Sequence, residues 1–181
     1  VAQDLYERKL TTYPRTDARV LSSAVAKEIS KNIRGLRSFE PVAPFVQNIM
    51  EHGLYKNIGK SSYTDDSKIT DHYAIIPTGQ VNEYKSLTEL QKWVYELIVR
   101  RFLSIFYPPA QYQTVKLTIG IEKESFFAGA KVLKVPGYLE IAGRPDTKEK
   151  REKEDGDGEE NNPKNSAALL KLADSLKEGD T

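Results

Sequence analysis

The spacing of apolar residues changes at Pro108-Pro109, and this change limits the folds that the chain can adopt. Up to that point apolar side chains recur every three or four residues, as on one face of an α-helix. Beyond it they alternate with polar residues or glycine, as in a half-buried β-strand, at Val115, Leu117, Ile119 and Ile121. The sequence therefore predicts an α+β protein, with helices in residues 1–107 followed by strands.

Four helices are expected before the change of spacing, over residues 2–9, 23–33, 41–50 and 87–106. Ser22 or Ser23 is a suitable N-cap for the second helix. Ser86-Leu87-Thr88-Glu89 has the pattern of a capping box for the fourth. The fourth helix is expected to bury one stripe, made of Leu90, Val94, Leu97, Ile98, Arg101, Phe102 and Ile105.

The strand part is expected to cover residues 108–143. Residues 126–132 should pair with the first strand as a hairpin, and 138–141 should form a third short strand. Residues 144–166 are charged and hold no apolar side chain that could anchor a core, so a flexible insertion is expected there, with a functional tail as the alternative. Apolar residues return within 167–181, which we assign to a return segment of the strand part.

Composition excludes several classes of protein. The chain has no cysteine, which removes disulfides, thiol nucleophiles and cysteine-based zinc sites. No apolar run reaches the ~20 residues that span a bilayer, and no signal peptide opens the sequence. We expect a soluble, cytoplasmic protein without a membrane partner, and the first and last residues suggest a piece of a longer chain.

Basic residues gather near the beginning of the chain. The net charge is only +1, yet residues 1–37 hold eight basic and four acidic side chains. Such a segment can face the phosphates of a nucleic acid. It can equally be the solvated face of a helix, and counting charges does not separate the two interpretations.

The clearest chemistry lies in residues 9–17, Lys-Leu-Thr-Thr-Tyr-Pro-Arg-Thr-Asp. Pro14 disfavours helix at Tyr13 and favours an extended backbone. Because residues two apart in an extended chain point the same way, Tyr13 and Arg15 are expected to share a face. The chain has ten tyrosines, so a tyrosine that only packs is the plain alternative.

A tyrosine beside an arginine suits phosphoryl transfer. A tyrosine phenol is a poor nucleophile at neutral pH, since its ordinary pKa lies near ~10. A guanidinium nearby favours the phenolate, and its planar fork can hold the attacked phosphate. Attack on a DNA phosphodiester leaves a phosphotyrosine bond that conserves the energy of the strand, so resealing needs no ATP.

His72 is the second candidate, at the edge of the apolar run 73–76. It can donate to a phosphate oxygen or move a proton, or it can be a histidine satisfied by local hydrogen bonds. No metal site is predicted, because Asp65-Asp66 and Asp155-Gly156-Asp157 lack the spacing of a calcium-binding loop. The sequence also has no glycine-rich phosphate loop.

Two segments together resemble one known family. Residues 5–17, Leu-Tyr-Glu-Arg-Lys-Leu-Thr-Thr-Tyr-Pro-Arg-Thr-Asp, are similar to the active-site motif of type IA DNA topoisomerases. Residues 65–78, Asp-Asp-Ser-Lys-Ile-Thr-Asp-His-Tyr-Ala-Ile-Ile-Pro-Thr, resemble their histidine motif in the form found in bacterial topoisomerase III. The likeness continues more weakly through 87–110 and the strands and returns at 175–180, which leaves 144–166 as an unmatched insertion.

This resemblance implies roles for individual residues. Tyr13 would form a 5′-phosphotyrosyl link, Arg15 would contact the scissile phosphate, and His72 would contact the phosphate or the DNA. The same loop would support the site or touch DNA through Thr16, Asp17 and Arg19. The helical part would be the mobile gate domain, related to winged-helix folds, and the strands would belong to the arch that joins the gate to the body.

The family also implies parts that this sequence does not contain. Its members need an N-terminal Toprim domain that supplies a glutamate and the acidic residues holding Mg²⁺. The chain alone is therefore expected to bind no metal and to be inactive. The substrate would be single-stranded DNA, the enzyme would associate with the nucleoid, and no protein partner is predicted.

Three other interpretations are considered. A non-catalytic DNA-binding module of winged-helix type would use Tyr13 and Arg15 only to touch backbone phosphates. A site-specific recombinase pairs its tyrosine with a His-x-x-Arg element, whereas Ile75 and Tyr55 stand three residues after the two histidines. A purely structural helical domain would make both motifs coincidental.

Overall fold

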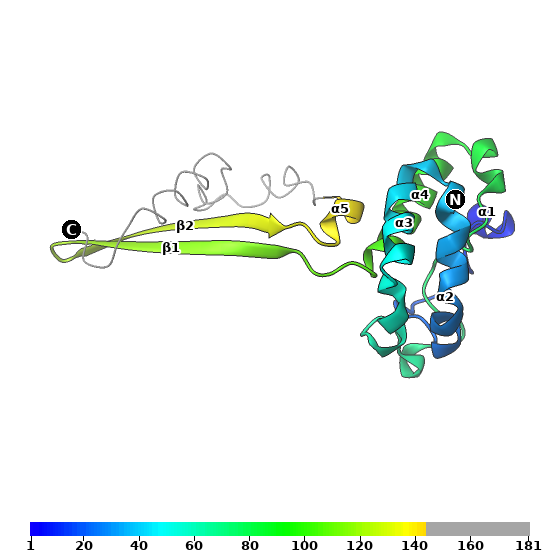
Figure 1. Cartoon of the computed structure of the whole chain (residues 1–181), viewed down its shortest axis with the longest axis horizontal. Helices are drawn as coiled ribbons and strands as arrows, with labels where there is room; N and C mark the ends of the chain where they lie inside the picture. Colours follow the sequence, from blue (N-terminus) through cyan, green and yellow to red (C-terminus); the bar gives the residue numbers. More distant parts are fainter. Residues whose placement is uncertain (144–181) are drawn as a thin grey trace. The chain divides into compact units, whose positions relative to one another are not determined.

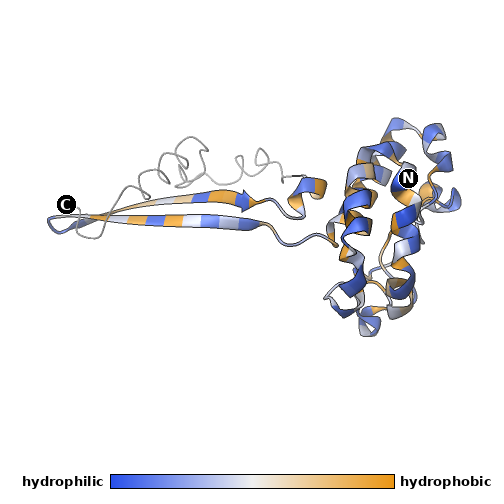
Figure 2. Cartoon of the chain, viewed as in Figure 1, coloured by the Kyte–Doolittle hydropathy of each residue, from blue (hydrophilic) through white to orange (hydrophobic). Residues whose placement is uncertain are grey.

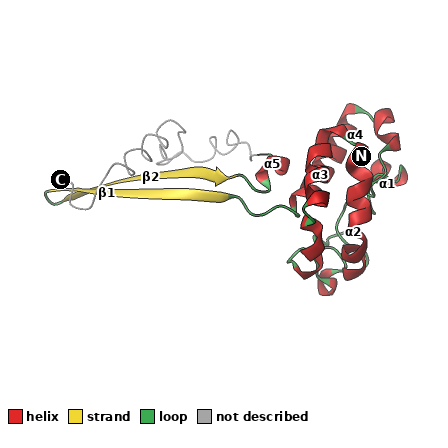
Figure 3. Ribbon diagram, viewed as in Figure 1, coloured by secondary structure: helices red, strands yellow, loops and turns green. Residues whose placement is uncertain are grey.

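The computed structural model describes residues 1–143 and divides them into two compact units (Figure 1). Unit 1 contains residues 1–108 together with 138–143, and unit 2 contains residues 109–137. Unit 1 is helical and unit 2 is a β-hairpin (Figure 3), so the α+β class predicted from the spacing is confirmed. The predictions made for 144–166 and 167–181 lie outside the described residues.

Unit 1 is built from four longer helical segments joined by short 3₁₀ turns. The α-helices are α1 (Ala2–Glu7), α2 (Ser23–Gly35), α3 (Ala43–Glu51), α4 (Glu89–Ser104) and the single turn α5 (Leu139–Ala142). The 3₁₀ turns are η1 (Leu36–Ser38), η2 (Glu40–Val42), η3 (Leu54–Lys60), η4 (Asp66–Lys68) and η5 (Asn82–Ser86). The four helices predicted from the sequence are therefore confirmed, with ends that differ by a few residues. Within residues 1–143 no helix is long and apolar enough to cross a membrane.

A single apolar core holds the helices of unit 1 together. Leu5 of α1 is fully buried, and apolar side chains from all the longer helices join it. The inward positions of α2, α3 and α4 include Ile29, Ile33, Val46, Ile49, Tyr95 and Val99. In Figure 2 apolar and polar positions alternate around these helices, as expected for elements with one buried face. Each such side chain contributes about 1.5–3 kcal/mol when it leaves water.

The start of α4 differs from the predicted capping box. Thr88 is the N-cap: its backbone N–H donates to Gln91 Oε1 (3.0 Å), and its Oγ1 accepts from the Gln91 backbone N–H (3.4 Å). The capping box therefore begins two residues after Ser86, where the sequence pattern predicts it. Leu87 is only 5% exposed, so it serves as a core residue before the helix, and the helix begins after it.

The buried face of α4 also differs from the predicted stripe. Leu90 and Leu97 are 59% and 53% exposed, whereas Tyr95 and Val99 are fully buried. Aromatic contacts select this face, because the ring centroid of Phe39 lies 5.6 Å from that of Tyr95. Apolar residues occur all around this helix, so spacing alone did not identify the side that packs.

The third strand predicted at 138–141 is wrong. Residues Leu139–Ala142 form the helical turn α5, which belongs to unit 1 and contacts α4. Gly137 has a positive φ of 53°, which turns the chain out of the strand direction, and the backbone N–H of Tyr138 donates to Pro108 O (2.9 Å). Leu139 and Ile141, whose spacing of two suggested a strand, are both buried from a single turn of helix.

Unit 2 is an antiparallel hairpin of β1 (Gln111–Ile121) and β2 (Glu124–Val135). Both predicted strands of the hairpin are confirmed. The register pairs Ile121 with Glu124 and places apolar partners on one face, namely Val115 with Ala130, Leu117 with Ala128, and Ile119 with Phe126. Cross-strand pairs of this kind are the units that stabilise a two-stranded sheet.

A close contact between two glycines joins the end of α2 to the segment that carries His72. A Cβ atom at Gly35 would lie 2.3 Å from the backbone oxygen of Gly79, and Gly79 itself has a φ of 92°. Asn32 Nδ2 also donates to Pro77 O (2.9 Å). The backbone after the histidine segment therefore lies directly against α2, with no room for a side chain at the contact.

Gly35→Ala is expected to lower the free energy of unfolding by about 1–3 kcal/mol, since the added methyl group forces two backbones apart. Urea denaturation of the purified chain measures this change. The matched control is Gly59→Ala, whose Cβ would find only Ala26 Cβ at 3.9 Å and should alter stability far less. Equal stability of the two variants would contradict the close contact.

The loop before the histidine segment is tied to the start of α2. Asp66 Oδ1 accepts a 2.8 Å hydrogen bond from the backbone N–H of Ser23. Hydrogen bonding by the Ser23 side chain, and then by this backbone N–H, lowers the pKa of Asp66. Asp65 forms an ion pair with Lys68 (2.7 Å) and accepts a hydrogen bond from Ser67 Oγ (2.6 Å). Lys68, and then Ser67, lower the pKa of Asp65 to about 2.

Because both pKa values are lowered by folding, the stability that these carboxylates provide is present above their ordinary pKa of ~4. It is lost as the pH falls towards about 2. Asp66→Asn, which keeps an acceptor for Ser23, should flatten the fall of unfolding free energy between these pH values in urea titrations. Asp71→Asn, at an exposed position of the same loop, is the control, and an equal flattening in both variants would contradict this account.

Candidate active site

The candidate site forms where residues 10–12 pair with residues 76–78. Thr11 and Pro77 make an isolated antiparallel bridge. On either side of it, Thr12 N donates to Ile76 O (2.9 Å) and Thr78 N donates to Leu10 O (3.0 Å). This short pairing joins two segments that are far apart in the sequence and carry Tyr13 and His72.

Two threonine hydroxyls strengthen the connection. Thr12 Oγ1 accepts from Ile76 N (3.0 Å) and donates to Ala74 O (3.3 Å). Thr16 Oγ1 donates to His72 O (2.7 Å) and accepts from Ala18 N (3.1 Å). The backbone on both sides of Tyr13 is therefore bound to the segment that carries the histidine.

The ring of Tyr13 contacts two other rings. Its centroid is 4.4 Å from that of His72, at an interplanar angle of 43°. The centroid of the Tyr6 ring is 5.2 Å from that of Tyr13, at 85°, which is an edge-to-face contact. The arrangement limits the positions that the phenol can take before any substrate arrives.

Tyr13 and His72 open into a pocket of about 350 Å³. Its lining also includes Tyr6, Lys9, Thr11, Thr12, Tyr73 and Thr78. Tyr13 is half-buried and His72 is exposed, so a large substrate can reach both. A tyrosine, a histidine and a lysine in the lining of one pocket are suited to an anionic substrate such as a phosphodiester.

The structure does not bring every predicted residue into this pocket. Arg15 and Asp17 are exposed and are not among the described residues that line this pocket. The chain bends at Pro14, so a shared face for Tyr13 and Arg15 stays a prediction. Thr16 acts on the site through the carbonyl of His72.

Arg19 lies at a different pocket, of about 390 Å³, beside the Thr16–Arg19 loop. Arg101 of α4 lines the same pocket, together with apolar residues such as Leu97 and Ile98. This position places Arg19 away from the residues that surround Tyr13, on a neighbouring surface of unit 1.

The described residues do not form a metal site. No group of three or more His, Cys, Asp or Glu side chains that could hold an ion is found within 1–143. Asp65 and Asp66 are engaged by Lys68 and Ser23, and Asp155-Gly156-Asp157 lies outside the described part. The residues of this region therefore do not fit a Mg²⁺ centre.

Tyr6 and Lys9 line the pocket, although the sequence alone did not predict a role for them. Tyr6 is on α1, seven residues before Tyr13, and it approaches Tyr13 only because the chain reverses after the helix. Lys9 makes that reversal with a φ of 59°, in a position usually taken by glycine or asparagine. No local sequence pattern predicts a left-handed backbone at a lysine, so only the structure shows that Tyr6 and Lys9 line the pocket.

Comparison with known proteins extends the likeness over most of the chain. A family model described as DNA topoisomerase matches residues 1–180. DNA topoisomerase 3 of Bacillus licheniformis is 35% identical over 156 residues, which are 86% of this chain and 21% of that protein. DNA topoisomerase 3 of Bacillus subtilis is 36% identical over 142 residues, 78% of this chain and 19% of that protein. The chain thus spans about a fifth of the length of these relatives.

Thr11 and Thr12 provide a matched test of the pairing. Thr12→Val removes two hydrogen bonds and leaves Ala74 O and Ile76 N with fewer partners, so the unfolding free energy should fall by about 1–3 kcal/mol. Thr11 Oγ1 is buried and has no hydrogen-bond partner among residues 1–143, so Thr11→Val should be neutral or slightly stabilising. Urea denaturation compares the two variants, and equal losses would contradict the role given to Thr12.

Proposed function

Because the chain belongs to the DNA topoisomerase family, as a bacterial type IA member of the topoisomerase III kind, we propose that it carries the DNA-cleaving nucleophile. In this proposal Tyr13 cuts and rejoins one strand of DNA within a longer enzyme that changes DNA topology. The observation that supports it most is the contact of the Tyr13 and His72 rings, 4.4 Å apart, in an open pocket.

The chemistry is a reversible transesterification. The phenol oxygen of Tyr13 attacks the phosphorus of a phosphodiester, and the bond from phosphorus to the 3′ oxygen breaks. The phenol proton leaves to a base or to water, and the departing 3′ oxygen takes up a proton. A 5′-phosphotyrosyl bond remains, and attack by the 3′ hydroxyl reverses the step without ATP.

The neighbouring residues have distinct roles in this proposal. Arg15 holds the scissile phosphate and stabilises the charge that develops on its oxygens. His72 donates to the same phosphate or to the adjacent DNA, and its ring contact keeps the phenol in place. The rest of the loop touches the single-stranded substrate through Thr16, Asp17 and Arg19.

The two units correspond to different parts of the enzyme in this proposal. Unit 1 is the mobile gate domain, related to winged-helix folds, and unit 2 belongs to the arch. Mg²⁺ is held by a Toprim domain elsewhere in the full-length protein, which acts in the cytoplasm on the nucleoid. The 181-residue chain alone therefore does not cleave DNA, and cleavage by the pure chain with Mg²⁺ would contradict this point.

Covalent trapping tests the nucleophile. The full-length protein is incubated with labelled single-stranded DNA and Mg²⁺ and then denatured quickly. Wild type should yield a protein–DNA adduct that Tyr13→Phe abolishes. The matched control is Tyr73→Phe, since Tyr73 lines the same pocket and its loss should leave the adduct in place.

Two outcomes would change the assignment. An adduct that survives Tyr13→Phe would identify a different nucleophile. A folded wild-type protein that binds DNA without forming an adduct would favour the non-catalytic DNA-binding module, in which Tyr13 and Arg15 only contact phosphates.

A further inference from the structure

One wall of the Tyr13 pocket is made by the end of α1. Tyr6 is 40% exposed even though its ring contacts the ring of Tyr13 edge to face at 5.2 Å. Leu5, the residue before it, is fully buried and already fixes the helix to the core. An aromatic ring that is this exposed beside a nucleophile has surface left for a further planar partner.

Lys9 completes this wall. The α1 helix ends in a Schellman-type arrangement, in which Lys9 N donates to Tyr6 O (2.8 Å) and Leu10 N donates to Leu5 O (2.9 Å). Thr78 Oγ1 donates to the carbonyl of Lys9 (2.6 Å). These bonds occupy carbonyls at the helix end that would otherwise repel an anion, and Lys9 is absent from the ion pairs within residues 1–143.

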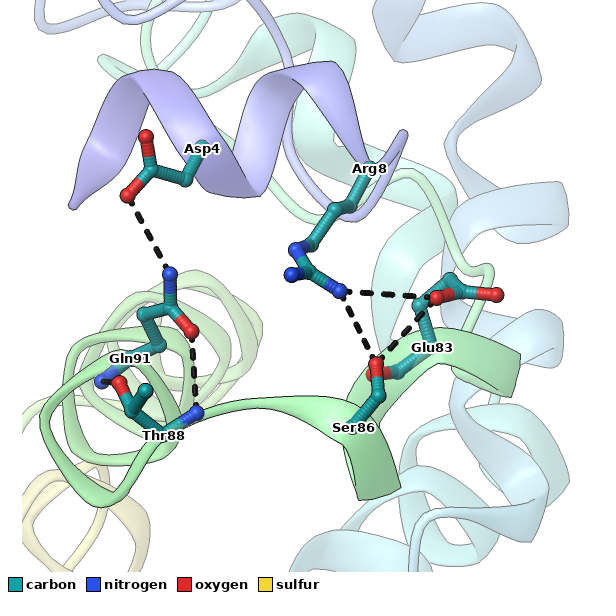
Figure 4. Close-up of polar contacts among 6 residues, drawn as sticks. All are labelled: Asp4, Arg8, Glu83, Ser86, Thr88 and Gln91. Carbon is teal, nitrogen blue, oxygen red and sulfur yellow. Dashed lines mark hydrogen bonds and ion pairs between the residues drawn. The ribbon is translucent and has the colours of Figure 1, made fainter.

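Polar contacts hold α1 at a fixed place on unit 1. Figure 4 shows Gln91, whose Nε2 donates to Asp4 Oδ2 (3.2 Å) while its Oε1 completes the cap of α4. At the other end of the helix, Arg8 donates to Ser86 Oγ (3.0 Å) and pairs with Glu83 (3.6 Å). Tyr6 and Lys9 are therefore presented on an anchored element, which reduces the entropy lost when a ligand binds.

We propose that Tyr6 and Lys9 form a subsite for one nucleotide of the single-stranded DNA next to the scissile phosphate. The base stacks on the ring of Tyr6, and the phosphate of that nucleotide contacts the ammonium of Lys9. An aromatic platform beside a cation is the chemistry with which proteins bind single strands without reading their sequence. This inference rests on the proposed function, because it takes the scissile phosphate to lie at Tyr13.

A supporting role for Tyr6 alone would have a different signature. If the ring only kept Tyr13 in place, its removal would slow adduct formation equally on every substrate. A stacking subsite instead couples Tyr6 to the base at one position of the DNA. The test therefore varies the protein and the DNA together, as in a double-mutant cycle.

Binding is measured by fluorescence anisotropy with the full-length protein in the Tyr13→Phe background, which prevents cleavage. The ligands are labelled single strands with one abasic site moved across the cleavage position. Tyr6→Leu should weaken binding of the intact strand about 5- to 100-fold, and Tyr6→Phe should not. In the protein that keeps Tyr6, an abasic site at one position should weaken binding by a similar factor relative to the intact strand. In Tyr6→Leu the same abasic site should cause no further loss of affinity.

Lys9 is tested through the salt dependence of the same binding. Lys9→Gln should reduce the slope of log affinity against log salt concentration by about 0.7, the value for one phosphate contact to a single strand. Lys9→Arg should restore it. The matched control pair is in unit 2, where Lys131 Nζ lies 4.5 Å from the ring centroid of Tyr112, and Tyr112→Leu and Lys131→Gln should leave both readouts unchanged.

The outcomes separate this inference from the nucleophile assignment. Suppose that wild type forms the adduct. The subsite is then overturned if no abasic position is coupled to Tyr6, or if Lys9→Gln does not change the salt slope, and Tyr13 remains the nucleophile. Coupling at one position without any adduct shows that Tyr6 binds a base of the single strand. It overturns the nucleophile and, with it, the position of the subsite next to a scissile phosphate. A wild-type protein that binds no single-stranded DNA overturns both.

Discussion

The candidate site depends on the short backbone pairing between residues 10–12 and 76–78. Only two main-chain hydrogen bonds flank the bridge between Thr11 and Pro77, yet they join segments more than sixty residues apart. Closing so long a connection costs chain entropy, and each hydrogen bond offsets only about 1 kcal/mol of it. Burial of Leu10 (0% exposed) and Ile76 (4% exposed) at the pairing supplies the remaining stabilisation.

The surroundings of the pairing make it rigid. The Gly35–Gly79 contact and the bond from Asn32 to Pro77 O fix one segment to α2. The other segment continues from α1, which is held to η5 and the start of α4. Exposed and half-buried side chains can then be presented to a substrate from segments that are fixed to the core of unit 1.

Lys9 has a backbone conformation that costs stability, and it lines the pocket of the candidate site. A left-handed conformation at a residue other than glycine costs about 1–2 kcal/mol, and here it is held by the bond from Thr78 to the Lys9 carbonyl and by the burial of Leu5 and Leu10 on either side. Glycine would adopt the same backbone more easily but would bring no charge. The conformational cost therefore places a lysine in the lining of the pocket that holds Tyr13 and His72.

The sequence by itself determined the α+β class, the helices and the hairpin, because hydrophobic period and end signals are local properties of the chain. It also determined the two motifs that carry Tyr13 and His72. Only the tertiary structure decided which face of α4 is buried, that residues 139–142 form a turn of helix, and that Tyr6 and Lys9 line the pocket. These features depend on packing between segments distant in sequence, and local spacing holds no information about which segments will meet.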